Sequence, residues 1–206
     1  MTARPTVRSA EGPSGQERDV MLRAFRWANR HVMLPMLRHP IVGAWVGSPL
    51  IGYFLTLTTT GRRSGLLRET PLNYAILDGQ IYVLSGFGAH ADWYLNLTAD
   101  PQVTLGLPGR TLQGAAAPVL DPVEAERAAM AVARNCGFAL VFEGTNPLTV
   151  TDEHLREQLA GRPVVRISTS EAIRPGRHDP GSHSWLLPHV VVPLAVIGAA
   201  QLLRRR

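Results

Sequence analysis

Short runs of strand-forming residues joined by tight-turn sequences constrain the fold of this chain more than any other feature. Residues 53–60 are β-branched, aromatic and apolar, and a glycine-bounded turn at 61–65 separates them from a second run at 68–77. Asp78-Gly79 then leads into residues 80–85, and Asp-Gly is a strong short-range hairpin signal. These runs therefore predict antiparallel hairpins.

Three further runs complete the same pattern later in the chain. Residues 103–107 and 111–120 are joined through Pro108-Gly109, and residues 164–168 form a closing run. Helices interrupt the strands without alternating with them one for one, which argues against a doubly wound parallel sheet. Five or six mostly hairpin-linked strands with inserted helices predict an α+β domain built on an antiparallel barrel.

Start and stop signals mark three short helices between these strands. Residues 92–99 precede Pro101, which cannot continue a helix. Asp121 followed by Pro122 has the residue types of a helix cap and first turn, and predicts a helix that extends to about residue 134. Residues 151–159 have a similar capped start.

The composition fits one folded domain with additional segments at its ends. The 206 residues are 45% hydrophobic and 18% charged, which is enough for an ordinary core. Cys136 is the single cysteine, so the chain can form neither an internal disulfide nor a cysteine cluster for zinc, and no metal is expected. The net charge of +5, carried by arginine alone, favours an anionic partner: a polyanionic cofactor, nucleic acid or an acidic membrane.

Four segments make up the predicted organisation: a disordered lead-in at 1–19, a barrel domain at 20–170, a linker at 171–184 and a hydrophobic segment at 185–206. The barrel domain begins with a basic amphipathic helix at 20–38, kinked or ended near Pro35, which either lies on anionic lipid or packs on the barrel.

The hydrophobic segment at 185–206 is the second candidate for membrane contact. Its length is close to the ~20 residues that span a bilayer, although two prolines weaken it as a span. It either inserts into a membrane as an anchor or forms a buried or oligomer-packing C-terminal helix. The expected location is the cytoplasm or the cytoplasmic side of a membrane, and a homodimer is compatible with the sequence.

The strongest candidate for a binding site is the arginine-rich turn after the first predicted strand. Gly61 and Gly65 are expected to leave backbone N–H groups open, and Ser64 adds a hydroxyl donor. Guanidiniums converge on the same turn from Arg62, Arg63 and Arg68. The turn therefore favours an anionic ligand, and the alternative is a solvated basic hairpin.

A second candidate segment begins with the glycine-rich sequence at 85–88 and continues into the predicted helix at 92–99. Gly86, Gly88 and Ala91 match the dinucleotide fingerprint superficially, but no βαβ unit or ribose-binding carboxylate follows. A glycine-rich strand end instead allows a flat ring to approach the backbone closely. The alternative for the helix is that Trp93 and Leu97 are core residues one turn apart.

In joint order and spacing, these segments resemble the deazaflavin (coenzyme F-420)-dependent nitroreductases from about residue 38 to residue 168. The resemblance implies a split β-barrel of the flavin-reductase type. It also implies an oxidoreductase that transfers hydride from reduced coenzyme F-420 to a small-molecule acceptor, such as a quinone or a nitro compound. The cofactor supplies that chemistry and the protein supplies the position, so no obvious acid–base pair is needed.

The resemblance also assigns residues to the cofactor. It implies that the turn holds the phosphate and acidic tail through Arg62, Arg63, Ser64, Gly65 and Arg68. It implies that the deazaflavin ring or its linker is lined by Thr70, Pro71, Ser85, Gly86, Phe87, Gly88, Trp93 and Asn96. Negative charge that develops on the acceptor could be met by a backbone N–H or by Tyr74 or Tyr94, the two candidate catalytic residues.

Two rival functions are compatible with the same barrel. One is an FMN-dependent reductase or oxidase, with FMN in place of the deazaflavin. The other is a non-catalytic basic module that binds lipid or nucleic acid. Nucleic acid is disfavoured as a partner because no aromatic residues are interleaved with the arginines for base stacking.

Overall fold

The computed structural model describes residues 23–24, 27–38, 52–107, 110–136, 149–171 and 173. The lead-in at 1–19, the Pro108-Gly109 turn, nearly all of the linker at 171–184 and the hydrophobic segment at 185–206 lie outside these ranges. No helix among the described residues is both long enough and apolar enough to cross a membrane.

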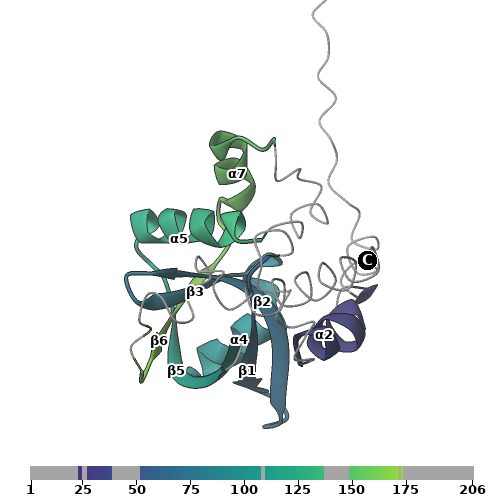
Figure 1. The fold of residues 1–206 in the computed structure, drawn as a ribbon. Coiled ribbons are helices and arrows are strands. Elements are labelled where there is room, and N and C mark those ends of the chain that lie inside the picture. Colours follow the sequence, from purple (N-terminus) through teal and green to yellow (C-terminus); the bar gives the residue numbers. More distant parts are fainter. Residues whose placement is uncertain are drawn as a thin grey trace, which may run out of the picture.

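Six strands form a closed barrel in the order β1-β2-β3-β6-β5-β4, and every neighbouring pair is antiparallel (Figure 1). The strands are β1 (Phe54–Thr60), β2 (Leu67–Leu77), β3 (Gln80–Leu84), β4 (Gln102–Leu107), β5 (Arg110–Pro118) and β6 (Val164–Thr169). The predicted α+β class and antiparallel barrel are therefore confirmed. Most strand ends differ from the ends of the predicted runs by one or two residues.

Strand β2 explains how the barrel is split. Its first part, residues 67–73, pairs with β1, and its last part, residues 74–77, pairs with β3. Each part of β2 therefore has a partner strand on one side. Pro71 lies in the first part. A proline is tolerated there because no N–H donor is needed on the side of a strand that has no partner strand.

The Asp78-Gly79 turn joins β2 to β3 as the sequence predicts. Asp78 has φ 51° and Gly79 has φ 75°, so both residues are in the left-handed region. Two such residues form the turn type whose twist matches a two-stranded hairpin. Leu77 pairs with Gln80 directly beside the turn, which sets the register of the hairpin.

Capping residues begin two of the helices where the sequence predicts. Asp121 precedes α5 (Pro122–Arg134), and its carboxylate accepts the Glu124 N–H at 2.7 Å. Thr151 precedes α7 (Asp152–Leu159), and its hydroxyl accepts the His154 N–H at 3.3 Å. Helix α4 (Asp92–Ala99) also has its predicted bounds and follows the 3-10 turn η2 (Gly88–His90).

The N-terminal helix continues past Pro35 rather than ending there. A π-helical turn, η1 (Asn29–Met33), leads into α2 (Leu34–Arg38), which contains Pro35. The Leu34 N–H bonds to the Asn29 carbonyl five residues back, and this wider turn gives the proline ring room. Both pieces lie near β2, but Trp27 is 62% exposed and Val32 is 42% exposed, so the described part of this helix leaves both alternatives open.

Two apolar clusters position the helices. The first fills the barrel interior with residues such as Leu55, Leu57 and Ile167, and α4 adds Trp93 and Leu97 to it. The second lies outside the barrel, where α5 and α7 pack over β3 and its neighbours. Figure 1 shows α4 at one end of the barrel and α5 and α7 at the other.

Candidate cofactor-binding site

The turn between β1 and β2 is closed by its own hydrogen bonds. The Gly61 N–H donates to the Leu66 carbonyl at 2.9 Å, and the Gly65 N–H donates to the Gly61 carbonyl at 2.8 Å. Gly65 has φ 67°, which favours glycine at this position. The prediction that the two glycines leave their amides open is therefore wrong, because a turn this tight satisfies its own backbone groups.

Arg62 connects the turn to helix α4. Its Nη1 donates to Asn96 Oδ1 at 3.0 Å and to Asp92 Oδ1 at 3.2 Å, and its Nη2 reaches the same Asp92 oxygen at 3.2 Å. The Arg62 side chain is 22% exposed and that of Asp92 is 64% exposed. The guanidinium is therefore committed to the start of α4.

Asn96 continues this connection into the barrel wall. Its Oδ1 also accepts the backbone N–H of Arg62 at 3.2 Å, and its Nδ2 donates to Thr59 Oγ1 at 3.3 Å. Both Asn96 and Thr59 are buried. Two segments that the sequence predicted as one site, the turn and the helix at 92–99, thus lie side by side.

Arg63 and Arg68 differ from Arg62 in their side-chain bonds. Both are exposed, and neither forms a hydrogen bond or an ion pair with another described residue. Arg68 lies on β2 opposite Thr59, the residue that accepts the Asn96 bond. The turn therefore presents two available guanidiniums on a base that Arg62 and Asn96 hold in place.

The predicted ring-lining residues vary in burial. Ser85 is fully buried, and its hydroxyl donates to the Gly88 carbonyl at 2.6 Å. Pro71 is buried on β2, Thr70 and Phe87 are half-buried, and Gly86 is exposed. Trp93 is only 7% exposed and belongs to the interior cluster, so the structure favours the core alternative for this residue.

The two candidate catalytic tyrosines lie in different surroundings. Tyr74 is 3% exposed within the barrel interior, and its carbonyl accepts a bond from Asn135 Nδ2 at 3.0 Å. Tyr94 is half-buried on α4 and meets Trp93 edge to face, with ring centroids 6.0 Å apart. Tyr94 is therefore the more accessible of the two.

Asp92 and Thr59 take part in this arrangement although the sequence reasoning assigned them no role. Each meets a partner more than 29 positions away in sequence, which no local pattern reports. The one signal available was the place of Asp92 at a helix start, where an acidic side chain is common.

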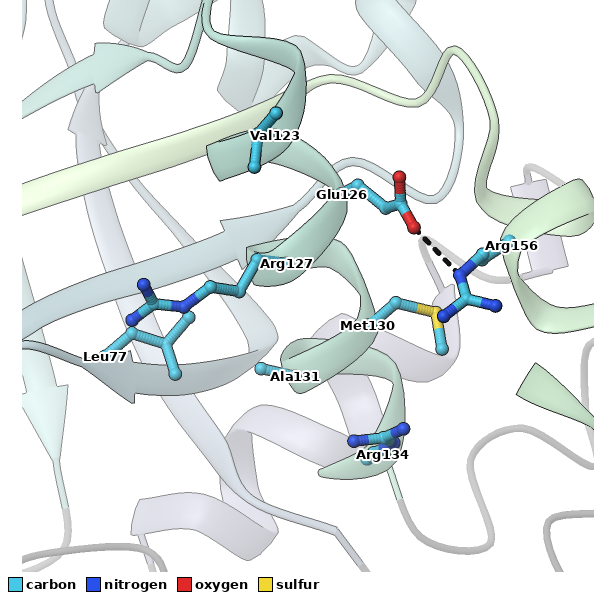
Figure 2. Close-up of a pocket in the computed structure, with 8 residues that line it drawn as sticks. All are labelled: Leu77, Val123, Glu126, Arg127, Met130, Ala131, Arg134 and Arg156. Atoms are coloured by element: carbon cyan, nitrogen blue, oxygen red, sulfur yellow. Dashed lines mark hydrogen bonds and ion pairs between the residues drawn. The ribbon is translucent and has the colours of Figure 1, made fainter. Parts of the chain in front are cut away.

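A surface pocket of about 440 Å³ lies on the other side of the barrel, between α5, α7 and the end of β2 (Figure 2). None of the predicted site residues lines it. Its arginines are paired with carboxylates: Arg127 with Asp78, Arg134 with Asp152 at 2.9 Å, and Arg156 with Glu126 at 2.8 Å. This pocket therefore lacks the uncompensated positive charge that a polyanionic cofactor requires.

The closed antiparallel barrel carries an arginine-bearing turn that is hydrogen-bonded to α4, and this is the split-barrel architecture that the sequence predicts. A sequence model of the F420H2-dependent quinone reductases matches residues 36–153, which is more than half of the chain. The protein belongs to this family. The predicted relation to deazaflavin-dependent oxidoreductases is thereby confirmed.

Solved structures of similar fold have low sequence identity to this chain. A conserved hypothetical protein from Mycobacterium tuberculosis is 24% identical, with a TM-score of 0.45 over 63% of this chain and 79% of its own. An F420H2-dependent reductase is 22% identical, with a TM-score of 0.37 over 56% of this chain and 93% of its own. A Bacteroides thetaiotaomicron protein described as a 5-nitroimidazole antibiotic resistance protein is 13% identical, with a TM-score of 0.41 over 58% and 74%. No curated protein matches the sequence.

Proposed function

We propose that this protein reduces a quinone with hydride from reduced coenzyme F-420. Family membership supports the deazaflavin as donor and a quinone, rather than a nitro compound, as acceptor. The observation that carries the proposal is the pair of exposed guanidiniums of Arg63 and Arg68 on a turn that is bonded to α4. Such a pair suits the phosphate and carboxylates of the cofactor tail.

The donor set fits this polyanion. Arginine forms forked, charge-assisted hydrogen bonds to phosphate and carboxylate, and two arginines on one turn offer several such bonds at once. Arg62 holds the turn against α4, because its guanidinium is bonded to Asp92 and Asn96. We therefore assign Arg63 and Arg68, with Ser64, to the tail and assign Arg62 to the position of the turn.

When bound, the deazaflavin supplies the hydride, and the residues of this chain supply position and shelter from water. The ring is assigned to the segment 85–88 and to Thr70 and Pro71, and Gly65 stays with the turn that is assigned to the tail. Trp93 and Asn96 are buried on α4 and are assigned to support this helix. Tyr94 is the residue assigned to meet negative charge on the acceptor, because it is less buried than Tyr74.

A lipophilic quinone would bring the protein to a membrane surface. The hydrophobic segment at 185–206 is the part of the sequence that supports this, with its near-spanning length. Comparing membrane fractionation of the full chain with that of a chain ending at Arg177 tests the role of this segment. Equal recovery of both in the soluble fraction would exclude it as an anchor.

Cofactor titration of the full chain tests the central proposal. Each charge-assisted hydrogen bond contributes about 1.5–3 kcal/mol, so Arg63→Ala or Arg68→Ala should weaken F-420 binding roughly 10- to 100-fold. The binding of the wild type should also weaken as salt rises. Arg134→Ala removes the same charge on the far side of the barrel and should leave affinity nearly unchanged.

Three results would contradict the proposal. The first is unchanged F-420 affinity in the Arg63→Ala, Arg68→Ala double variant. The second is tighter binding of FMN than of F-420. The third is rapid oxidation of NADPH by the pure protein without added flavin or deazaflavin, because no dinucleotide-binding unit is present in the described residues.

A further inference from the structure

The end of the β1–β2 hairpin exposes two consecutive leucines. Leu66 is 60% exposed and Leu67 is 73% exposed, although leucine is among the residues most often buried. Gly65 places them just after the left-handed position of the turn. We define residues 63–68 as the hairpin tip; in Figure 1 the β1–β2 hairpin ends at the bottom of the barrel, away from α5 and α7.

Both charges within the hairpin tip are positive, and the acidic Glu69 follows directly after Arg68. Arg63 and Arg68 flank them and have no ion pair with a described residue, whereas the nearby Asp92 is already paired with Arg62 at 3.2 Å. An apolar pair between two available guanidiniums is complementary to a surface with anionic groups over a hydrocarbon layer. Two adjacent leucines alone would fit any apolar partner. The flanking charges of Arg63 and Arg68 are what favour an anionic lipid surface.

We propose that the hairpin tip docks on an anionic lipid bilayer, with Leu66 and Leu67 inserted at the headgroup boundary. This inference deepens the proposed function, because docking would bring the arginine-bearing turn and α4 against the membrane that holds a lipophilic quinone. It needs no membrane-spanning helix. Apolar burial provides part of the affinity and attraction to lipid phosphates provides the rest.

Arg63 and Arg68 are proposed to bind both the cofactor tail and the lipid phosphates. Substitutions of the two leucines therefore distinguish lipid binding from cofactor binding. Leu66→Ser with Leu67→Ser should weaken vesicle binding at least about tenfold and leave F-420 affinity unchanged. Arg63→Ala or Arg68→Ala should weaken vesicle binding roughly fivefold and also weaken F-420 binding. If the wild type binds anionic vesicles as expected but does not bind F-420, the proposed function is contradicted and the docking proposal is not.

The test is cosedimentation of the full chain with vesicles of phosphatidylcholine, with and without phosphatidylglycerol. The wild type should bind the anionic vesicles more tightly, and salt should weaken that binding. A matched control is Leu120→Ser with Val123→Ser, because these residues are 90% and 76% exposed near the start of α5. That variant should bind vesicles like the wild type.

Several outcomes would overturn the proposal. These are no binding of the wild type to anionic vesicles, equal loss in the hairpin-tip and control variants, or no loss when both tip leucines are replaced. Sedimentation equilibrium adds one more: a wild-type dimer that dissociates in the Leu66→Ser, Leu67→Ser variant would place the leucines in a contact between two copies instead.

Discussion

Replacement of Arg62 by alanine tests whether this residue positions the turn. The substitution removes a charge-assisted hydrogen bond to Asn96, which is only 4% exposed, and an ion pair with Asp92, which is 64% exposed. The bond to a buried partner contributes about 1.5–3 kcal/mol, whereas solvent screening reduces the exposed ion pair to about 0.5 kcal/mol or less.

Backbone support lowers the expected loss. Asn96 Oδ1 keeps the backbone N–H of residue 62 as a donor at 3.2 Å, so the substitution leaves no buried acceptor without a partner. We therefore expect Arg62→Ala to lower the free energy of unfolding by about 1–2 kcal/mol, which corresponds to about 2–4 °C in Tm for each kcal/mol in a domain of this size.

Urea denaturation of the full chain, followed by circular dichroism, measures this change. The matched control is Arg63→Ala, which removes the same side chain from the neighbouring, exposed position and should change stability by less than about 0.5 kcal/mol. Both variants should bind F-420 less tightly, and Arg62→Ala alone should also be destabilised. Equal midpoints for the two variants would refute the positioning role of Arg62.

Two further predictions concern α5. Burial, followed by the hydrogen bond to Glu124 at 2.8 Å, raises the pKa of Tyr82 above 10.0, so the fold favours the protonated phenol. The contribution of this shift to the free energy of unfolding is complete below about pH 10 and is lost as pH rises through the raised pKa. Above about pH 10, the free energy of unfolding should therefore fall less steeply with pH in Tyr82→Phe than in the wild type. Parallel curves for the two proteins would contradict this. Asp121→Ala removes the cap of α5 and should cost about 1 kcal/mol in urea denaturation, with Asp121→Asn recovering most of it; equal loss in both variants would argue against the cap.

Local signals explain why most of the fold could be predicted from the sequence. Asp78-Gly79 forces a left-handed pair of residues, and Asp121 and Thr151 supply oxygens to helix starts, so each signal acts within four residues. The N-terminal helix is less predictable, because Pro35 alone does not indicate the π turn that precedes it.

The candidate site could be predicted only in part, because it depends on contacts between residues that lie far apart in the sequence. The position of the turn follows from its glycines and arginines, but the different roles of Arg62 and Arg63 depend on contacts across 30 and 34 positions. Those contacts exist only once α4 lies against the end of β1. Likewise, no local pattern separates a Trp93 that lines a cofactor from one that fills the barrel interior.

Closure of the barrel between β3 and β6 has a kinetic consequence. Ser168 Oγ donates to Gln80 Oε1 at 2.7 Å across 88 positions, and Ile81 pairs with Ile167 in the same ladder. Hairpins form in microseconds, whereas a pairing this distant must first overcome the entropy of a long loop. We expect the β2–β3 hairpin to form early and the seam with β6 to close late, so substitutions along β6 should act mainly on the unfolding rate.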